Sequence, residues 1–141
     1  MRTMILATLV VAQAAGAGTL ATRPSVLGVW SNPKGTLAVR TQPCGPADTV
    51  GAAALCGAIV RAEPKAVADA RDAGVVQLIG TQLLQDYRPI GRASWSGRVF
   101  VPDMGRSFSS RIRQTSPDAL TISGCLIGGM FCKSQEWHRV G

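Results

Sequence analysis

Residues 28–35 read Gly28-Val29-Trp30-Ser31-Asn32-Pro33-Lys34-Gly35 and contain the start of a β-hairpin. Pro33 sets the φ angle that a turn needs and Gly35 tolerates a positive φ, so the last four residues favour a turn. Apolar and polar side chains alternate along the strand that follows, which makes one face of the sheet apolar and the other solvated. We expect strands at residues 27–31 and 36–42, with Trp30 closing one end of a small β-barrel.

The first 21 residues have the composition of a secretory signal peptide. Arg2 supplies the positive charge, residues 4–15 are an almost unbroken apolar run, and small residues follow, with candidate cleavage sites between Ala17 and Ala21. The apolar run is shorter than the ~20 residues that a membrane-spanning helix needs. We therefore expect residues 1–21 to be removed and residues 22–141 to form one periplasmic or secreted domain without a transmembrane segment.

The chain is basic, with 15 lysines and arginines against eight acidic residues and a formal net charge of +7. Removal of Arg2 with the signal peptide lowers this charge by one. The arginines are scattered along the sequence and form no legible patch, and an exported protein rarely meets nucleic acid. We expect a solvated basic surface and no nucleic-acid partner. Anionic components of the cell envelope are the remaining partners that this charge suggests.

The four cysteines of an exported chain indicate disulfides. Three pairings are possible, and the pairs Cys44–Cys56 and Cys125–Cys132 are the economical choice because each closes a short local loop. On the chain-entropy model each contributes roughly 2–3 kcal/mol. A metal site is the alternative, but the spacings lack the close C-x2-C of zinc sites and His138 is the only histidine. We expect no metal and no cofactor.

The rest of the chain reads as short strands with one helix. Several alanines between residues 65 and 73 have high helix propensity, and Gly74 is placed as a helix C-cap. Turn residues follow most of the strands, and residues 85–94 read as a polar loop. Beyond the first hairpin, we expect strands at residues 55–61, 75–84, 95–101, 106–114, 119–125 and 131–140.

These elements predict an all-β protein with about eight antiparallel strands and one short helix. Sequential antiparallel strands of this number close most simply as an up-and-down barrel, which removes the unpaired edges of the sheet. A two-sheet sandwich would have the same strand pattern and stays open as the alternative. We expect a monomer.

Four motifs in order give the chain a resemblance to a known family. It is similar to the bacterial domain-of-unknown-function family 2147, whose members are exported proteins with a lipocalin-like barrel. The resemblance implies the fold and the compartment, and it supplies no biochemical role. The chain departs from the family pattern around the helix, at residues 65–76. The matching segments are Gly28-Val29-Trp30, Leu55-Cys56-Gly57-Ala58-Ile59-Val60, residues 95–108, and Gly124-Cys125 with residues 132–139.

The resemblance implies a structural role for two residues far apart in the chain. In lipocalin-like barrels, a Gly-x-Trp near the start packs beneath an arginine from the last strand. Trp30 and Arg139 hold those places here. An arginine over an indole is a cation–π pair worth ~0.5–2 kcal/mol. We expect these two side chains to touch and to close one end of the barrel.

Aromatic residues are the candidates for ligand binding. A barrel lined by Trp95, Phe108 and Trp137 would suit an apolar ligand, with Phe100 as a further candidate. Trp95 and Phe100 have opposite strand parity, so both line the barrel only if a bulge intervenes. Such residues are more often ordinary core.

Three functions follow as hypotheses. The first is an exported protein that holds a small apolar or amphipathic molecule in a hollow barrel. The second is an envelope interaction module with a filled barrel, which contacts protein or an anionic polymer through its basic outer face. The third is a hydrolase that uses His138 beside Glu136 and recruits a serine. No catalytic motif is present in the sequence, so we expect a binding protein and not an enzyme. An empty apolar cavity of ~300 Å³ or more favours the first hypothesis, and a packed interior favours the second.

Overall fold

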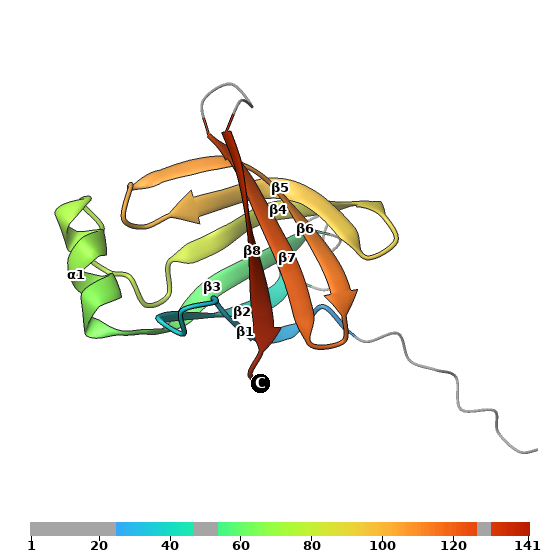
Figure 1. Ribbon diagram of the computed structural model, residues 1–141, viewed down its shortest axis with the longest axis horizontal. Coiled ribbons are helices and arrows are strands. Elements are labelled where there is room, and N and C mark those ends of the chain that lie inside the picture. The colour runs from blue at the N-terminus through green and yellow to red at the C-terminus, as the bar shows by residue number, and fades with distance from the viewer. Residues whose placement is uncertain (1–24, 47–53, 127–130) are drawn as a thin grey trace, which may run out of the picture.

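A computed structural model describes residues 25–46, 54–126 and 131–141. In this part of the chain, eight antiparallel strands pair in sequence order and close into a barrel (Figure 1). The barrel prediction is confirmed and the open sandwich is not formed. The predicted signal peptide, residues 1–21, lies outside the described residues. The elements are β1 (Gly28–Ser31), β2 (Leu37–Pro43), β3 (Leu55–Ala62), α1 (Pro64–Asp72), β4 (Gln82–Gly91), β5 (Ser94–Val101), β6 (Arg106–Ser116), β7 (Ala119–Leu126) and β8 (Phe131–Arg139).

Large side chains fill the middle of the barrel. The most buried of them come from six different strands and are each less than 2% exposed. Burial of this apolar surface, at about 25 cal/mol per Å², is the main force that holds the sheet closed. The middle of the barrel is therefore a packed core. These side chains are Trp30, Val39, Ile59, Leu84, Tyr87, Ile112 and Leu120.

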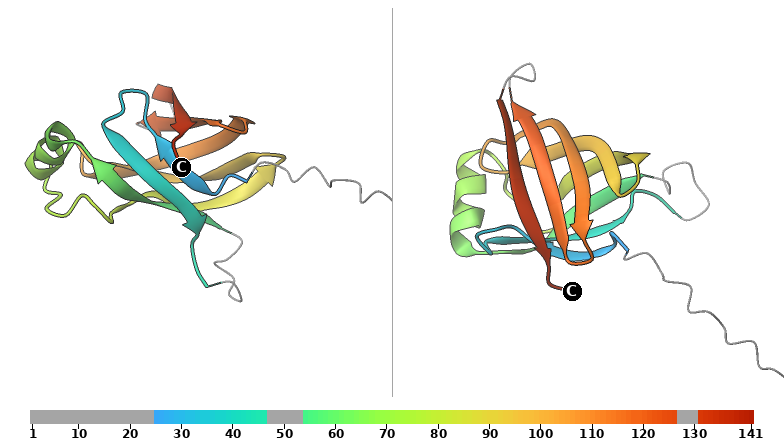
Figure 2. Two further views of the ribbon diagram at one scale, coloured as in Figure 1. Left: turned by 90° about the horizontal axis from the view of Figure 1, so that it is seen from below. Right: turned by 45° about the vertical axis from the view of Figure 1, so that its right-hand side comes forward.

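The helix covers one end of the barrel, here called the helix end (Figure 2). Pro64 begins α1 at a position where its missing N–H costs nothing. Ala70 is fully buried, and Ala66 and Val67 pack against the core. The turn between β5 and β6 also lies here, because a Cβ on Gly105 would come within 2.7 Å of the Ala73 carbonyl oxygen.

The opposite end is here called the terminal end. β1 begins there and β8 ends there, beside the turns β4–β5 and β6–β7 (Figure 1). β1 and β8 close the barrel through two residue pairs, Trp30 with Arg139 and Ser31 with His138. Residues 131–137 of β8 pair with β7. On their other side, no strand within the described ranges pairs with them.

One strand lies elsewhere than the sequence predicted. We expected a strand at residues 75–84 and a loop at 85–94, and both expectations are wrong. Gly74 and Gly80 have φ angles of 91° and 89°, so the chain turns before β4 begins at Gln82. Within β4 the register shifts between Gln85 and Arg88. This bulge conceals the strand from a search for simple alternation.

The residue after the bulge packs against a glycine in the next strand. Asp86 takes a φ of 50°, and Tyr87 then points into the core, where it is 0% exposed. A Cβ on Gly97 would lie 2.7 Å from the Tyr87 ring carbon Cγ. Only glycine leaves room for the phenol ring at this place in β5.

None of the helices within the described residues has the length and apolarity to cross a membrane.

Candidate functional site

Arg139 lies over Trp30 at the terminal end of the barrel. The guanidinium carbon is 4.3 Å from the centre of the indole ring. The indole Nε1 donates to the Val26 carbonyl at 3.0 Å, which holds the segment before β1 against the ring. Trp30 is 1% exposed, so the cation covers an indole that is otherwise packed in the core. The contact expected between these two residues is present.

Arg139 also joins two segments that are distant in sequence. Its Nη1 donates to the Leu27 carbonyl at 2.9 Å, and its Nη2 donates to the Ser25 carbonyl. On the other side, Nε donates to the Pro117 carbonyl at 3.0 Å. Because a guanidinium is planar with a fixed fork of donors, one side chain can hold both segments at once.

Steric crowding explains why the Gly-x-Trp motif has a glycine at its first position. A Cβ placed on Gly28 would lie 2.3 Å from Nη1 of Arg139 and 2.8 Å from the Gly141 carbonyl oxygen. Gly28 also has a φ of 155°, which side chains rarely adopt. The guanidinium therefore passes directly over the backbone at a residue that has no side chain.

A hollow of about 570 Å³ opens beside this clamp. Its walls are the segment that precedes β1, the β4–β5 turn and the end of β6. Half-buried side chains form its floor, and exposed, mostly polar side chains form its rim. The hollow lies within the ~300–1,000 Å³ range of small-molecule sites. The residues that line it are Ser25, Val26, Arg92, Ala93, Trp95, Gln114, Thr115, Ser116 and Pro117.

Gln114 places a polar group in this floor. Its backbone N–H donates to the Ala93 carbonyl at 2.9 Å, which fixes β6 against the β4–β5 turn. The side-chain Nε2 is shielded from solvent and has no hydrogen-bond partner among the described residues. An unpaired buried donor costs about 1–3 kcal/mol. An acceptor atom that reached this amide would remove that cost.

Comparisons with known proteins agree with this geometry. Residues 28–139 match the family described as "uncharacterized protein conserved in bacteria", domain of unknown function 2147. The chain belongs to this family. None of the curated proteins matches this chain.

Among solved structures, this member of family 2147 is similar to protein HP1028 from the human pathogen Helicobacter pylori. That protein is described as belonging to the lipocalin family. The match has a TM-score of 0.56 and 13% sequence identity, and it covers 84% of this chain and 85% of the other. At this identity the likeness shows the fold alone. The chain is a lipocalin-like barrel, and Trp30 under Arg139 is the closure expected of that fold.

The aromatic residues proposed as lining do not lie together. Trp95 lies in the floor of the hollow. Trp137 is 5% exposed and belongs to the packed core. Phe108 lies toward the helix end, where the Arg106 guanidinium carbon is 6.0 Å from its ring centre. Phe100 is paired with Ser107 and has the opposite strand parity to Trp95.

Of the residues that line the hollow, sequence reasoning named only Trp95 and missed Val26, Arg92 and Gln114 among the others. For Gln114 a signal was present, since it follows Ser110 and Ile112 at steps of two and so shares their inward parity. Val26 and Arg92 lie outside the strands, and no periodicity predicts where such residues meet. Their approach depends on the closure of the barrel.

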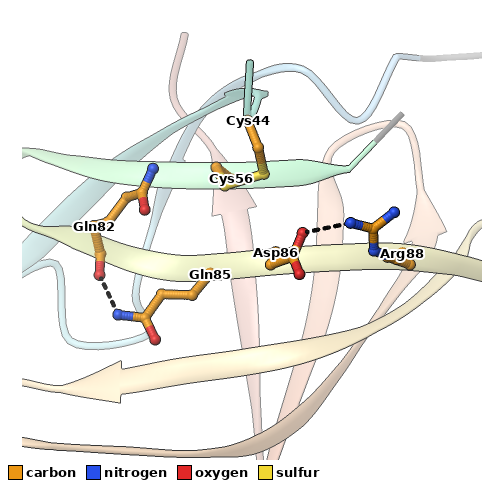
Figure 3. The surroundings of a disulfide bond; sticks show 6 residues. All are labelled: Cys44, Cys56, Gln82, Gln85, Asp86 and Arg88. Carbon is orange, nitrogen blue, oxygen red and sulfur yellow. Dashed lines mark hydrogen bonds and ion pairs between the residues drawn. A yellow bond between two sulfur atoms is a disulfide. The ribbon is translucent and has the colours of Figure 1, made fainter. Parts of the chain in front are cut away.

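Both predicted disulfides are present. Cys44 and Cys56 join the end of β2 to β3, with an S–S distance of 2.03 Å (Figure 3). Cys125 and Cys132 face each other across β7 and β8, with a Cα–Cα distance of 4.0 Å. The first disulfide lies where β2 ends and β3 begins, and the second lies where β7 ends and β8 begins. The two bonds are therefore at opposite ends of the barrel.

The residues considered for catalysis lie on the outside of β8. His138 and Glu136 are both exposed. Their cross-strand partners on β7 are Ala119 and Thr121. Within the described ranges, no three side chains of the His, Cys, Asp and Glu types come together as a metal site would require.

Tyr87 is the one strongly perturbed titratable group of the core. Burial raises the pKa of its phenol well above the usual range, and the nearby Ser110 lowers it by a smaller amount. The phenol oxygen has no hydrogen-bond partner in the described part of the chain. The Ser110 hydroxyl donates to the Ser123 carbonyl at 2.5 Å instead. Tyr87 therefore fills the core as a neutral phenol.

Proposed function

We propose that this member of family 2147 is an exported binding protein that holds a small amphipathic molecule in the terminal-end hollow. The packed core argues against a ligand in the middle of the barrel, because seven large side chains already fill that space. The hollow lies outside this core and is large enough for a small molecule. This differs from the hollow-barrel hypothesis in the place of the ligand and keeps its chemical class.

The lining gives the ligand its chemistry. Trp95 and Val26 offer apolar surface, which suits the apolar body of the molecule. Gln114 offers an unpaired amide donor and Arg92 a guanidinium at the rim. These groups fit a carboxylate or another anionic head that accepts hydrogen bonds. The unpartnered Gln114 amide beside Trp95 is the observation that carries the proposal.

Binding fits the hollow better than catalysis. The described residues that line it include hydroxyls from Ser25, Thr115 and Ser116 but no histidine, aspartate or glutamate that could act as a base. Export rests on the sequence of residues 1–21 and on the two disulfides, which persist in oxidising compartments. We therefore infer a role in the periplasm or outside the cell.

Native mass spectrometry of the exported protein tests this proposal. We expect a non-covalent adduct of a small amphipathic molecule on the wild type. The adduct should disappear in Trp95→Ala and in Gln114→Leu. Phe108→Ala is the matched control, because it removes an aromatic ring toward the helix end and should keep the adduct. An adduct that is lost only in Phe108→Ala would contradict the proposed site.

A further inference from the structure

Four arginines that look scattered in the sequence share one outer face of the barrel. They are Arg88 on β4, Arg98 on β5, and Arg111 and Arg113 on β6, and all four are exposed. We call this set the arginine face. The three strands are neighbours in the barrel wall (Figure 1). The set is not legible in the sequence because it forms only when the strands pair.

The strand register brings these side chains close together. Ser96 on β5 pairs with Arg88 on one side and with Arg111 on the other. Since neighbouring strands lie about 4.8 Å apart, the backbones of these two arginines are about 10 Å from each other. Arg98 is opposite Ser109, and Arg113 is opposite Ser94. Cross-strand pairing has thus gathered arginines that are 10 to 25 positions apart in the sequence.

One carboxylate forms an ion pair with the face, and a second, that of Glu136 on β8, is in register with Arg113 through Thr121. Asp86 on β4 pairs with Arg88 at 3.2 Å (Figure 3). Arg98 donates to the Ser107 carbonyl at 3.1 Å, a contact without a countercharge. For Arg111 and Arg113, no ion pair or side-chain hydrogen bond joins them to any described residue. Exposed arginines of this kind contribute little to stability, so the fold does not account for their clustering.

The side chains between the arginines are hydroxyls. Ser94, Ser96 and Ser109 occupy the paired positions opposite the four arginines, with Ser96 opposite two of them. Guanidinium groups bind phosphate oxygens through two parallel hydrogen bonds, and serine hydroxyls add a further donor. A membrane surface, in contrast, engages faces that carry apolar or aromatic side chains beside the cations. Exposed Ile90 borders the face beyond Arg88 on β4, while the positions between the arginines carry hydroxyls, which fit phosphate oxygens.

From this arrangement we infer that the arginine face binds a linear phosphate polyanion along β4, β5 and β6. Arginines separated by about 7–10 Å in two directions of the sheet can contact several phosphates of one extended chain. The surface is separate from the hollow, whose lining includes none of the four arginines. The inference is therefore independent of the proposed small-molecule site.

The test compares two double variants with the same loss of charge. Arg111→Gln/Arg113→Gln removes half of the arginine face. Arg40→Gln/Arg61→Gln removes two exposed arginines from β2 and β3, outside the face. The probe is inorganic polyphosphate, and binding is measured by fluorescence anisotropy over a range of salt concentrations. Because all four side chains are exposed, both variants should keep the wild-type melting temperature.

We expect the first variant to lose about tenfold or more in affinity at ~0.1 M salt, with the slope of log K against log salt reduced by about 2. The second variant should stay within about threefold of the wild type and keep its slope. An equal loss in both variants would overturn the inference, because net charge alone would then explain the binding. Tighter binding to phosphatidylglycerol vesicles than to polyphosphate, with the same loss in the first variant, would overturn it in favour of a membrane.

Discussion

The guanidinium carbon of Arg139 lies 4.3 Å from the ring centre of Trp30, and the two residues face each other across β8 and β1. The same guanidinium donates to the carbonyls of Leu27 and Pro117. One side chain therefore closes the barrel and fixes two walls of the hollow. Stability and the shape of the candidate site depend on the same contact.

Arg139→Ala should destabilise the protein by about 2–3 kcal/mol, since it removes a cation–π pair and several charged hydrogen bonds. For a domain of this size, the melting temperature should fall by about 10 °C. Arg139→Lys should recover only a small part of this loss, because one ammonium group cannot reach both segments. Circular dichroism melting of the two variants measures the effect.

The matched control is Arg111→Ala, which removes an exposed arginine from β6 and should leave the melting temperature within about 2 °C. Equal melting temperatures for Arg139→Ala and the wild type would show that the closure does not depend on this clamp. Full recovery by lysine would show that charge alone suffices.

Tyr87 is the only tyrosine of the chain, so its ionisation can be followed by absorbance without overlap. Burial raises the pKa of the phenol in the folded state, whereas the unfolded chain has a pKa near the usual value of about 10. The folded state then keeps a proton that the unfolded state releases. The stability that this proton contributes is complete below about pH 10 and is lost as the pH rises further.

We expect no phenolate absorbance in the folded protein between about pH 10 and 11. Tyr87→Phe should be as stable as the wild type or about 1 kcal/mol more stable at neutral pH, because the hydroxyl has no partner. The variant should also lose the part of the alkaline destabilisation that comes from this residue. Titration of the wild-type phenol near pH 10 with the fold intact would contradict the buried position.

The unpaired side of β8 should be visible in amide hydrogen exchange. Val140 N donates to the Val29 carbonyl at 2.8 Å, so alternate N–H groups back along the strand point the same way. Those of Ser134 and Glu136 therefore face the side without a paired strand. The N–H groups of Gln135 and Trp137 face β7. We expect rapid exchange at Ser134 and Glu136 and protection at Gln135 and Trp137. Uniform protection would mean that something else covers this edge in solution.

Most of the strands could be predicted because neighbouring residues determine where each one begins and ends. Turn residues such as Pro33 and Gly35 lie between alternating segments, and each disulfide closes a short loop. The closure of Trp30 by Arg139 came from the family resemblance. β4 was misplaced because the bulge at Asp86 breaks the alternation and because the expected strand at residues 75–84 begins in a turn with Gly80.

The candidate sites could not be read from the sequence because each depends on contacts between distant segments. Arg92 and Gln114 meet only when the β4–β5 turn packs against β6. Arg88 and Arg111 become neighbours only through Ser96, which pairs with both. Register is a property of the folded sheet, and no spacing along the chain encodes it.

Tryptophan fluorescence during a titration with dodecanoate tests the proposed hollow most directly. Trp30 and Trp137 are buried in the core, and Trp95 is the half-buried tryptophan in the floor of the hollow. We predict a saturable spectral change that persists in Trp137→Phe and disappears in Trp95→Phe. A change that persists in Trp95→Phe and disappears in Trp137→Phe would place the ligand inside the barrel and contradict this account.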